Sequence, residues 1–298
     1  MSGFAALGAL QLGFVYGLVA LGILLSFRML NYPDLTVDGS FPLGAAVTAA
    51  VVVAGGNPWL ALLAGALAGA AAGALTALLS EGLGILNLLA GILSMTALYS
   101  INIRVMGRPN LPLLGEPTVV DTAAMLGLGP QAAKLVVAAA ACALAALLVG
   151  LFLATRYGLS LRATGANPRM AAAVGVHCVQ RVAVGLALSN ALCALAGGLF
   201  AQLYGFADVS MGVGTIVIGL AALILGEAML RRWSPAAAVL ACVAGAIAYR
   251  FTISLALETE ALGLTTSDLN LISAAVVTLA FLFSRHGRRL RLRARAAP

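Results

Sequence analysis

The stretch QAAKLVVAAAACALAALLVGLFLA, residues 131–154, contains one lysine and no acid. An α-helix needs about 20 predominantly apolar residues to cross the hydrocarbon core of a bilayer, and this run supplies them. The stretch therefore predicts a membrane-spanning helix. Similar runs recur on both sides of it, so it sets the pattern for the rest of the chain.

Composition extends this prediction to the whole protein. Of the 298 residues, 62% are hydrophobic and 9% are charged, against about 25% charged in typical soluble proteins. The mean hydropathy is +1.06. A soluble domain of this size could not bury so many apolar side chains, so soluble enzymes, nucleic-acid-binding proteins and disordered chains are excluded. The sequence predicts an all-α polytopic membrane protein formed by a single domain, residues 1–298.

Apolar windows predict nine spanning helices, within a range of eight to ten. Two prolines, a glycine and two carboxylates interrupt the chain in residues 29–42 and stop a helix there. Irregular backbone survives at membrane depth only where protein or water covers it, so a broken or re-entrant segment is expected. The predicted spans are 4–27, 41–55, 58–79, 84–106, 131–154, 182–204, 211–230, 236–253 and 269–283, of which 41–55 and 269–283 are short.

Arginines predict the orientation, because cytoplasmic loops are enriched in basic residues. Residues 156–181 hold four arginines and no acid, and the tail 285–298 is also rich in arginine. Both are expected in the cytoplasm, with the tail anchored to anionic lipid headgroups or, alternatively, frayed in solution. The N-terminus and residues 107–130 are then external, unless residues 29–42 hide an extra half-crossing. Arg104 and Arg108, beside the external loop, run against the rule.

The chain carries a weak internal symmetry. The segment after the first span and the segment after the sixth both place a tyrosine, an aspartate and a glycine ahead of a Gly/Ala-rich helix. In the predicted topology the two units face opposite sides, as the inverted repeats of transport proteins do. The matched residues are Tyr32, Asp34, Gly39 and Gly44 in the first unit, and Tyr204, Asp208, Gly212 and Gly219 in the second.

Glycines also predict close helix packing. Gly65, Gly69 and Gly73 stand four residues apart on one face of the third span, where another helix can approach closely.

No catalytic set, metal-ligand cluster or nucleotide-binding motif is found in the sequence, so no enzymatic activity and no cofactor are expected. Energy must come from an ion gradient or from another subunit, and the nearly uncharged span interiors favour another subunit. A secondary transporter driven by an ion gradient would need an acid inside the bundle, for which Asp38 and Glu227 are the candidates. Glu227 is also spaced for an ion pair with Arg231.

The basic loop 156–181 contains a short helix of its own. Asn167 is a natural N-cap, Pro168 occupies the first helical position, and Gly175 lies where the helix would end. A short capped helix between two long spans predicts a rigid knob that faces the cytoplasm. The alternative interpretation is a solvated basic loop.

The strings LRATGANPRMA (161–171) and SNALCALAGGL (189–199) resemble the branched-chain amino acid and ribose family of ABC importer permeases. The linker PDLTVDGSFPLGA (33–45) is closer to a subgroup regarded as tryptophan/tyrosine-type importers, and departs from the Asn-Phe-Ala-His-Gly type of sequence in branched-chain permeases. The resemblance implies import of aromatic or branched-chain amino acids, or alternatively of a sugar or nucleoside. It also implies a location in the bacterial cytoplasmic (inner) membrane.

The resemblance further implies partners. A cytoplasmic ABC ATPase dimer would hydrolyse ATP and receive the short helix as a coupling helix, an extracytoplasmic binding protein would deliver substrate, and a second copy would complete the transporter. Gly165 is expected to give the turn before this helix, Asn167 its cap, and Arg169 a polar contact to the ATPase. The residues expected to couple to the ATPase are Arg162, Gly165, Asn167, Pro168, Arg169 and Met170.

The translocation path is expected between two copies related by a two-fold axis, because one bundle with uncharged span interiors offers no polar route. Asp38 and Ser40 lie in the broken segment, and three residues of the fourth span recur at spacings of seven and eight, along one stripe of a helix. For each of them a helix–helix hydrogen bond is the alternative role. The candidate lining residues are Asp38, Ser40, Asn87, Ser94 and Asn102.

Overall fold

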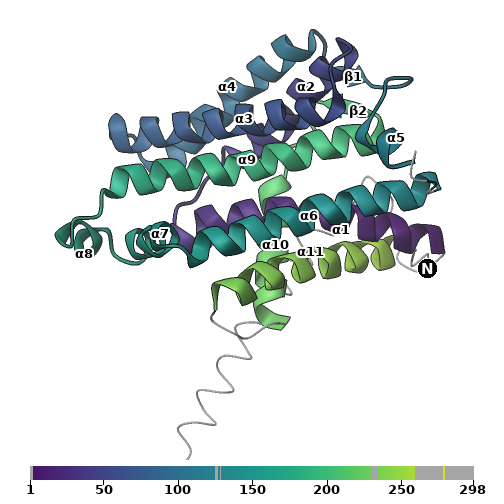
Figure 1. The fold of residues 1–298 in the computed structure, drawn as a ribbon. Coiled ribbons are helices and arrows are strands. Elements are labelled where there is room, and N and C mark those ends of the chain that lie inside the picture. Colours follow the sequence, from purple (N-terminus) through teal and green to yellow (C-terminus); the bar gives the residue numbers. More distant parts are fainter. Residues whose placement is uncertain (1–2, 125–126, 128, 230–233, 259–277, 279–298) are drawn as a thin grey trace, which may run out of the picture.

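Helices make up most of the described chain in the computed structural model, which describes residues 3–124, 127, 129–229, 234–258 and 278 (Figure 1). A two-stranded antiparallel sheet, β1 (Asn110–Pro112) with β2 (Phe206–Asp208), joins two loops. The helices are α1 (Gly3–Ile23), continued by the π-helical η1 (Leu24–Met29), α2 (Val37–Val53), α3 (Pro58–Ala77), continued by η2 (Leu78–Gly82), α4 (Asn87–Met106), α5 (Val119–Ala124), α6 (Pro130–Ala154), α7 (Arg156–Ala166), α8 (Pro168–Ala173), α9 (Cys178–Tyr204), α10 (Thr215–Met229) and α11 (Pro235–Glu258).

Among the described residues, six helices are long and apolar enough to cross a membrane, and α2 and α10 are shorter apolar helices. Together they correspond to the first eight predicted spans. The predicted ninth span, 269–283, and the tail 285–298 lie outside the described residues. Several boundaries differ from the prediction by three to five residues: α2 begins at Val37 rather than 41, α10 begins at Thr215 rather than 211, and α11 ends at Glu258 rather than 253. Helix α9 begins at Cys178 rather than 182, and α4 begins at Asn87 rather than 84, because Gly84 adopts a positive φ of 73° that ends the preceding turn.

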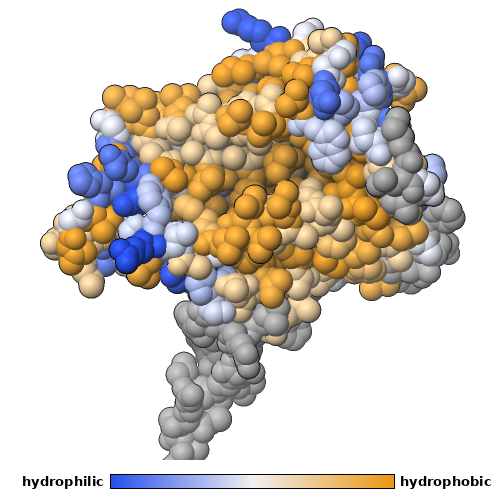
Figure 2. Space-filling model, in the orientation of Figure 1, coloured by the Kyte–Doolittle hydropathy of each residue, from blue (hydrophilic) through white to orange (hydrophobic). Residues whose placement is uncertain are grey.

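The surface has an apolar middle between two polar ends (Figure 2). Hydrophilic residues gather around α7 and α8 at one end and near β1 and β2 at the other. Between these ends, exposed leucines cover α6, as expected for a helix that faces lipid tails. They are Leu144, Leu147, Leu148 and Leu151. We refer below to the α7–α8 end and the β1–β2 end.

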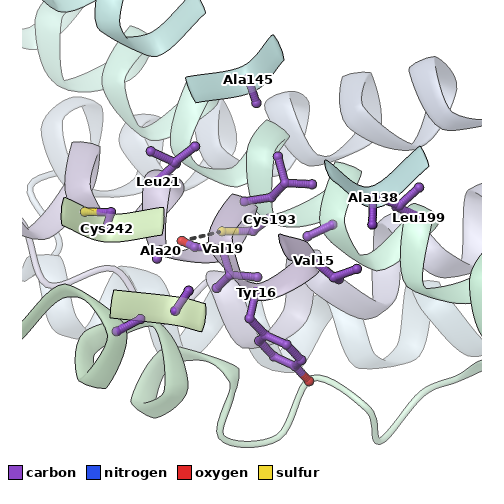
Figure 3. Close-up of a cluster of buried hydrophobic side chains, with 14 of the residues drawn as sticks. Val15, Tyr16, Val19, Ala20, Leu21, Ala138, Ala145, Cys193, Leu199 and Cys242 are labelled. Atoms are coloured by element: carbon purple, nitrogen blue, oxygen red, sulfur yellow. Dashed lines mark hydrogen bonds between the residues drawn. The ribbon is translucent and has the colours of Figure 1, made fainter. Parts of the chain in front are cut away.

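Helix α1 lies at the centre and packs against α6, α9, α10 and α11. Its side chains Val15, Val19 and Leu21 are fully buried and meet small residues of the surrounding helices. Small residues let membrane helices approach closely, and this packing replaces the hydrophobic effect that holds soluble cores together. Figure 3 shows Ala138 and Ala145 of α6, Cys193 and Leu199 of α9, and Cys242 of α11 in this cluster.

The segment between α1 and α2 turns back into the bundle, as predicted for a broken segment. In Figure 1 the chain leaves α1 near α7 and re-enters the bundle before α2 begins. Asn31 makes the turn with a φ of 54°, a left-handed conformation that Asn tolerates. Tyr32, Asp34 and Thr36 are 2%, 0% and 0% exposed. Helix α2 therefore begins inside the bundle.

The helix contacts agree with an inverted repeat. Helix α3 packs along α9 as α11 packs along α1, and α2 contacts α9 as α10 contacts α1. Helices α1 and α9 run in opposite directions in Figure 1. The matched glycines occupy equivalent places, since Gly44 lies against Ala194 of α9 and Gly219 lies against Val19 and Ile23 of α1.

Candidate functional site

Asp38 joins the two helices that begin inside the bundle. It lies in the first turn of α2, and its carboxylate oxygens accept hydrogen bonds from the backbone N–H groups of Gly214 (3.2 Å) and Ile216 (2.8 Å). These N–H groups lie at the start of α10, where the helix itself supplies no acceptor. Gly212 is needed for this approach, because a Cβ there would meet the Asp38 carbonyl oxygen at 2.0 Å. Asp38 therefore caps α10.

Asp34 is a fully buried carboxylate held by neutral donors. One oxygen accepts from the Thr36 N–H (2.9 Å) and the other from the Asn190 side-chain amide (2.7 Å). Asn190, on α9, in turn accepts a hydrogen bond from the Ser40 hydroxyl at 2.7 Å. A buried polar group is costly unless it is paired, so these bonds fix the linker and α2 against α9. We call Asp34, Asp38, Ser40 and Asn190 the central clasp.

A second set of buried hydrogen bonds attaches α4 to α2 and α3 of the same chain. The Thr76 hydroxyl donates to Ser94 at 2.7 Å and lies 2.8 Å from the Thr36 hydroxyl. The Asn102 amide donates to the Gly39 carbonyl at 3.2 Å. Ser94 and Asn102 are 3% and 0% exposed, and both face α2 and α3.

The third member of the predicted stripe lies apart. Asn87 is exposed at the first position of α4, on the surface rather than against α2 or α3. Of the five candidate lining residues, the structure brings Asp38, Ser40, Ser94 and Asn102 into the buried hydrogen bonds around α2. It leaves Asn87 outside them.

Glu227, the other acid considered for ion coupling, pairs with Arg28 at 2.6 Å. The contact joins the end of η1 to α10, between side chains that are both about half-exposed. The predicted partner Arg231 lies outside the described residues. Both acids considered for ion coupling, Asp38 and Glu227, therefore already bind groups of the protein.

The predicted capped helix is present at the α7–α8 end. The Asn167 side chain accepts from the Met170 N–H at 3.1 Å, Pro168 occupies the first turn of α8, and Gly175 has a φ of 84°. The sequence interpretation missed α7, which Thr155 caps by accepting from the Gly158 N–H at 3.1 Å.

The expected turn at Gly165 is wrong. Gly165 lies inside α7, and a Cβ there would meet the Met29 carbonyl oxygen at 2.0 Å. A glycine is required because the η1 backbone passes directly over it.

Helix α8 presents its outer face to the surroundings. Met170 and Val174 are 67% and 73% exposed, and Arg169 is exposed beside them, whereas Ala171 is 2% exposed and anchors the helix. Arg162, on α7, is half-buried. An exposed surface of apolar and basic side chains on a rigid, capped helix is suited to docking against another protein.

Tyr157 and Arg181 brace this end of the molecule. The Arg181 guanidinium stacks 3.7 Å from the centre of the Tyr157 ring, which ties α7 to α9. This contact holds α7 against α9 beside α8.

The β1–β2 end repeats the arrangement of Asp34. Asp208 accepts from the Ser210 N–H (2.8 Å), from the Ser210 hydroxyl and from the Asn110 amide (3.0 Å). Partial burial acts to raise the pKa of Asp208, but these hydrogen bonds outweigh it and hold the pKa below its usual value. Asp34 and Asp208, which are matched positions of the two sequence units, thus each bind the N–H two residues onward and one asparagine amide.

A multi-pass bundle in which two helices begin inside the protein is the architecture of a membrane transport protein. The family described as branched-chain amino acid transport system, permease component, matches residues 5–284. The chain belongs to this family. It is the membrane permease of an ABC transporter, a multi-pass protein of the bacterial inner membrane.

Individual proteins of known name, and one solved structure, are similar to this chain. The chain is 36% identical over 268 residues to the tyrosine transport system permease protein of Clostridioides difficile (strain R20291), covering 90% of this chain and 87% of that protein. It is 31% identical over 201 residues to the nucleoside ABC transporter permease protein NupC of Lactococcus lactis subsp. cremoris (strain MG1363), covering 62% and 60%. Its fold is similar to that of PsaBC from Streptococcus pneumoniae in complex with Fab, with a TM-score of 0.56, 14% identity and coverage of 97% and 94%. At this identity the likeness shows the fold alone.

Proposed function

We propose that this chain is the permease subunit of an ATP-driven importer of aromatic amino acids, with tyrosine as the first candidate substrate. The relative that carries this proposal is the tyrosine transport system permease protein, because it matches over nearly the full length of both chains. The linker at residues 33–45, which resembles tryptophan/tyrosine-type importers, supports the same substrate class. A nucleoside is the second candidate, favoured by a relative that matches over a shorter part of the chain.

In this proposal the α7–α8 end lies in the cytoplasm and the β1–β2 end faces outward. The arginines of residues 156–181 support this orientation. An ABC ATPase dimer docks on α8 through Arg169, Met170 and Val174, and hydrolyses the ATP. Arg162, Gly165, Asn167 and Pro168 support α8 from behind, through the contacts of α7 and the cap.

A substrate-binding protein delivers the amino acid at the β1–β2 end, and a second copy of the chain encloses the path. Asp38, Ser40, Ser94 and Asn102 hold the helices around this path rather than line it, since their hydrogen bonds lie within one bundle. Asn87 is exposed and stays a candidate for the lining near the cytoplasm.

The test is reconstitution of the permease with its ATPase and binding protein in liposomes, followed by uptake of radiolabelled L-tyrosine. We expect ATP-dependent accumulation that competing L-tryptophan reduces and uridine does not. Accumulation of uridine in place of tyrosine would support the nucleoside candidate. ATP-independent uptake driven by an imposed ion gradient would instead support a secondary transporter.

A further inference from the structure

Helix α4 carries polar residues on the face that points away from its own bundle. Thr96, Ser100 and Arg104 are exposed and stand four residues apart, so they form one line along the helix. The buried residues Ser94 and Asn102 lie on the opposite side. Helix α4 thus has two polar sides. Ser94 and Asn102 make hydrogen bonds inside the bundle, whereas Thr96, Ser100 and Arg104 face outward, with the Thr96 hydroxyl donating to backbone carbonyls of α4 itself.

This outward line is unlike the surfaces that face lipid. The large hydrophobic side chains exposed on α6 are Val136 and four leucines, and α3 exposes Leu60, Leu63 and Leu67. Helix α4 exposes apolar residues as well, among them Leu93, Ile101 and Val105, but the polar line runs between them. Polar and charged groups avoid hydrocarbon and gather where protein or water covers them. The line begins at Arg104, in the last turn of α4, and reaches Thr96 about 12 Å deeper in the membrane, at about 1.5 Å per residue. This face of α4 therefore offers a line of hydrogen-bonding groups that the exposed face of α3 lacks.

A hollow beside Arg104 is lined by residues of one helix only. It has a volume of about 220 Å³ and is lined by Ser100, Ile101, Arg104 and Val105, all of α4. A second copy of the chain on this face would supply the opposite wall. Within the described part of the protein, no hydrogen bond or ion pair is found for the Arg104 guanidinium. Arg104 also lies toward the β1–β2 end, so the positive-inside tendency of membrane proteins does not explain it.

We propose that Thr96, Ser100 and Arg104 of each copy face the translocation path between two copies, and that Arg104 binds the carboxylate of the transported amino acid. This inference rests on the proposed function. A guanidinium presents a planar fork of N–H donors that matches a carboxylate and keeps its charge at every physiological pH. Ser100, one turn deeper, offers the next hydrogen-bonding group. Arg104 is then a specificity-determining residue at the outer mouth of the path.

The placement of this face is tested by crosslinking, without reference to the substrate. Ser100→Cys is made in a Cys178→Ser background, since the other three cysteines are buried. In membranes, bifunctional methanethiosulfonates of graded length should join two Ser100→Cys chains into a covalent dimer. Leu67→Cys on the lipid-facing side of α3 is the matched control and should stay monomeric. Absence of the Ser100→Cys dimer at every length would overturn the placement.

The role of Arg104 is tested by uptake of L-tyrosine in the reconstituted complex. Arg104→Gln should lower uptake at least tenfold, while basal ATPase activity and tyrosine affinity of the binding protein stay unchanged. Arg104→Lys should recover part of the loss because the charge remains. Arg108→Gln, which removes an exposed arginine just beyond α4, should transport as the unmodified complex does. Tyramine, which lacks the carboxylate, should not compete.

Two failures are distinguishable in these experiments. If the unmodified complex does not take up tyrosine, the proposed substrate is wrong, and the crosslinking result still decides the placement of α4. If the unmodified complex transports tyrosine and Arg104→Gln transports it equally well, Arg104 does not bind the carboxylate and this inference is overturned.

Discussion

Asn190 is the residue on which the central clasp depends, because it donates to Asp34 and accepts from Ser40. Asn190→Ala would leave a buried carboxylate and a buried hydroxyl without their partner. Unsatisfied buried groups cost about 1–3 kcal/mol each, and more when charged. We expect a clear fall in the thermal midpoint of the purified protein in detergent. Thr252→Ala, on an exposed hydroxyl that bonds its own helix, should leave the midpoint unchanged.

A double-mutant cycle separates this pairing from general damage to α9. Removal of both partners, Asp34→Ala with Asn190→Ala, should destabilise the protein by less than the sum of the two single changes. Additive effects would contradict the pairing.

A different result is expected at Asp38, because its two carboxylate oxygens accept hydrogen bonds from the start of another helix, α10. Asp38→Ala removes both acceptors and should cost about 1–2 kcal/mol, the range for loss of an N-cap. Asp38→Asn keeps one acceptor, so its stability should lie between that of the unmodified protein and that of Asp38→Ala. The midpoints of thermal unfolding in detergent measure the order of stability of these variants. Asn57→Ala, which removes the exposed cap of α3, is the control and should have the smaller effect. An unchanged midpoint in Asp38→Ala would contradict the capping of α10.

The sequence pointed to Asp38 but not to the clasp around it. The prolines and glycine beside Asp38 mark a broken helix locally, so the segment could be recognised from its neighbours. The partner Asn190 lies 150 residues from Ser40 and 156 from Asp34, and no local pattern connects them. The spacing of Asn87, Ser94 and Asn102 predicted one stripe, of which the structure buries Ser94 and Asn102 on the same side and leaves Asn87 exposed. Both sides of α4 carry polar residues. Only the packing reveals which side is buried.

Among the helices, the contact of α3 with α9 depends on small residues. The predicted close approach at Gly69 and Gly73 is confirmed, since a Cβ there would meet the carbonyl oxygens of Asn190 and Leu186 at 2.5 and 2.2 Å. Gly73→Ala should therefore push the helices apart and lower the thermal midpoint or the membrane yield. Gly150→Ala on α6 has nothing within 4 Å and should be neutral or slightly stabilising, because alanine favours helix. Equal behaviour of the two variants would contradict this packing.

Helix α8 carries the prediction for energy coupling. Arg169→Glu reverses the charge of an exposed side chain without touching the cap at Asn167, so the protein should fold normally. If α8 docks on the ATPase, this variant should lose substrate-stimulated ATP hydrolysis and transport in liposomes. Arg156→Glu, an equal charge change at the exposed start of α7, is the control and should retain both. Normal stimulation in Arg169→Glu would rule out docking through this residue.

Long apolar helices were predictable because lipid and buried faces both demand apolar side chains. Helix α7 was not, because arginines and small polar residues in Arg156–Ala166 match a loop in composition. Its helical state depends on the Thr155 cap and on tertiary contacts, such as Gly165 beneath Met29 and Arg181 over Tyr157. Tertiary contacts of this kind override local composition.

At the scale of the whole molecule, the two repeats meet where their half-length helices begin. Asp38 of the first repeat caps α10 of the second, while α3 and α11 pack along α9 and α1. The Asp38 hydrogen bonds thus connect the first repeat directly to the start of α10 in the second. Helix α8 contacts α9, and Asn190 of the central clasp lies on the same helix α9, so one continuous helix connects the two sites.

The orientation of the whole bundle gives the last prediction. Cys178 lies at the α7–α8 end and is partly exposed, whereas Cys142, Cys193 and Cys242 are buried, so it can serve as a native probe. If this end is cytoplasmic, an impermeant maleimide should not label the protein in sealed right-side-out vesicles and should label it once the membrane is permeabilised. Cys178→Ser should remove the signal in both cases, which assigns it to this site. Labelling of sealed vesicles would place α8 outside the cell, where no ATPase could dock, and would reverse the path from Arg104 inward.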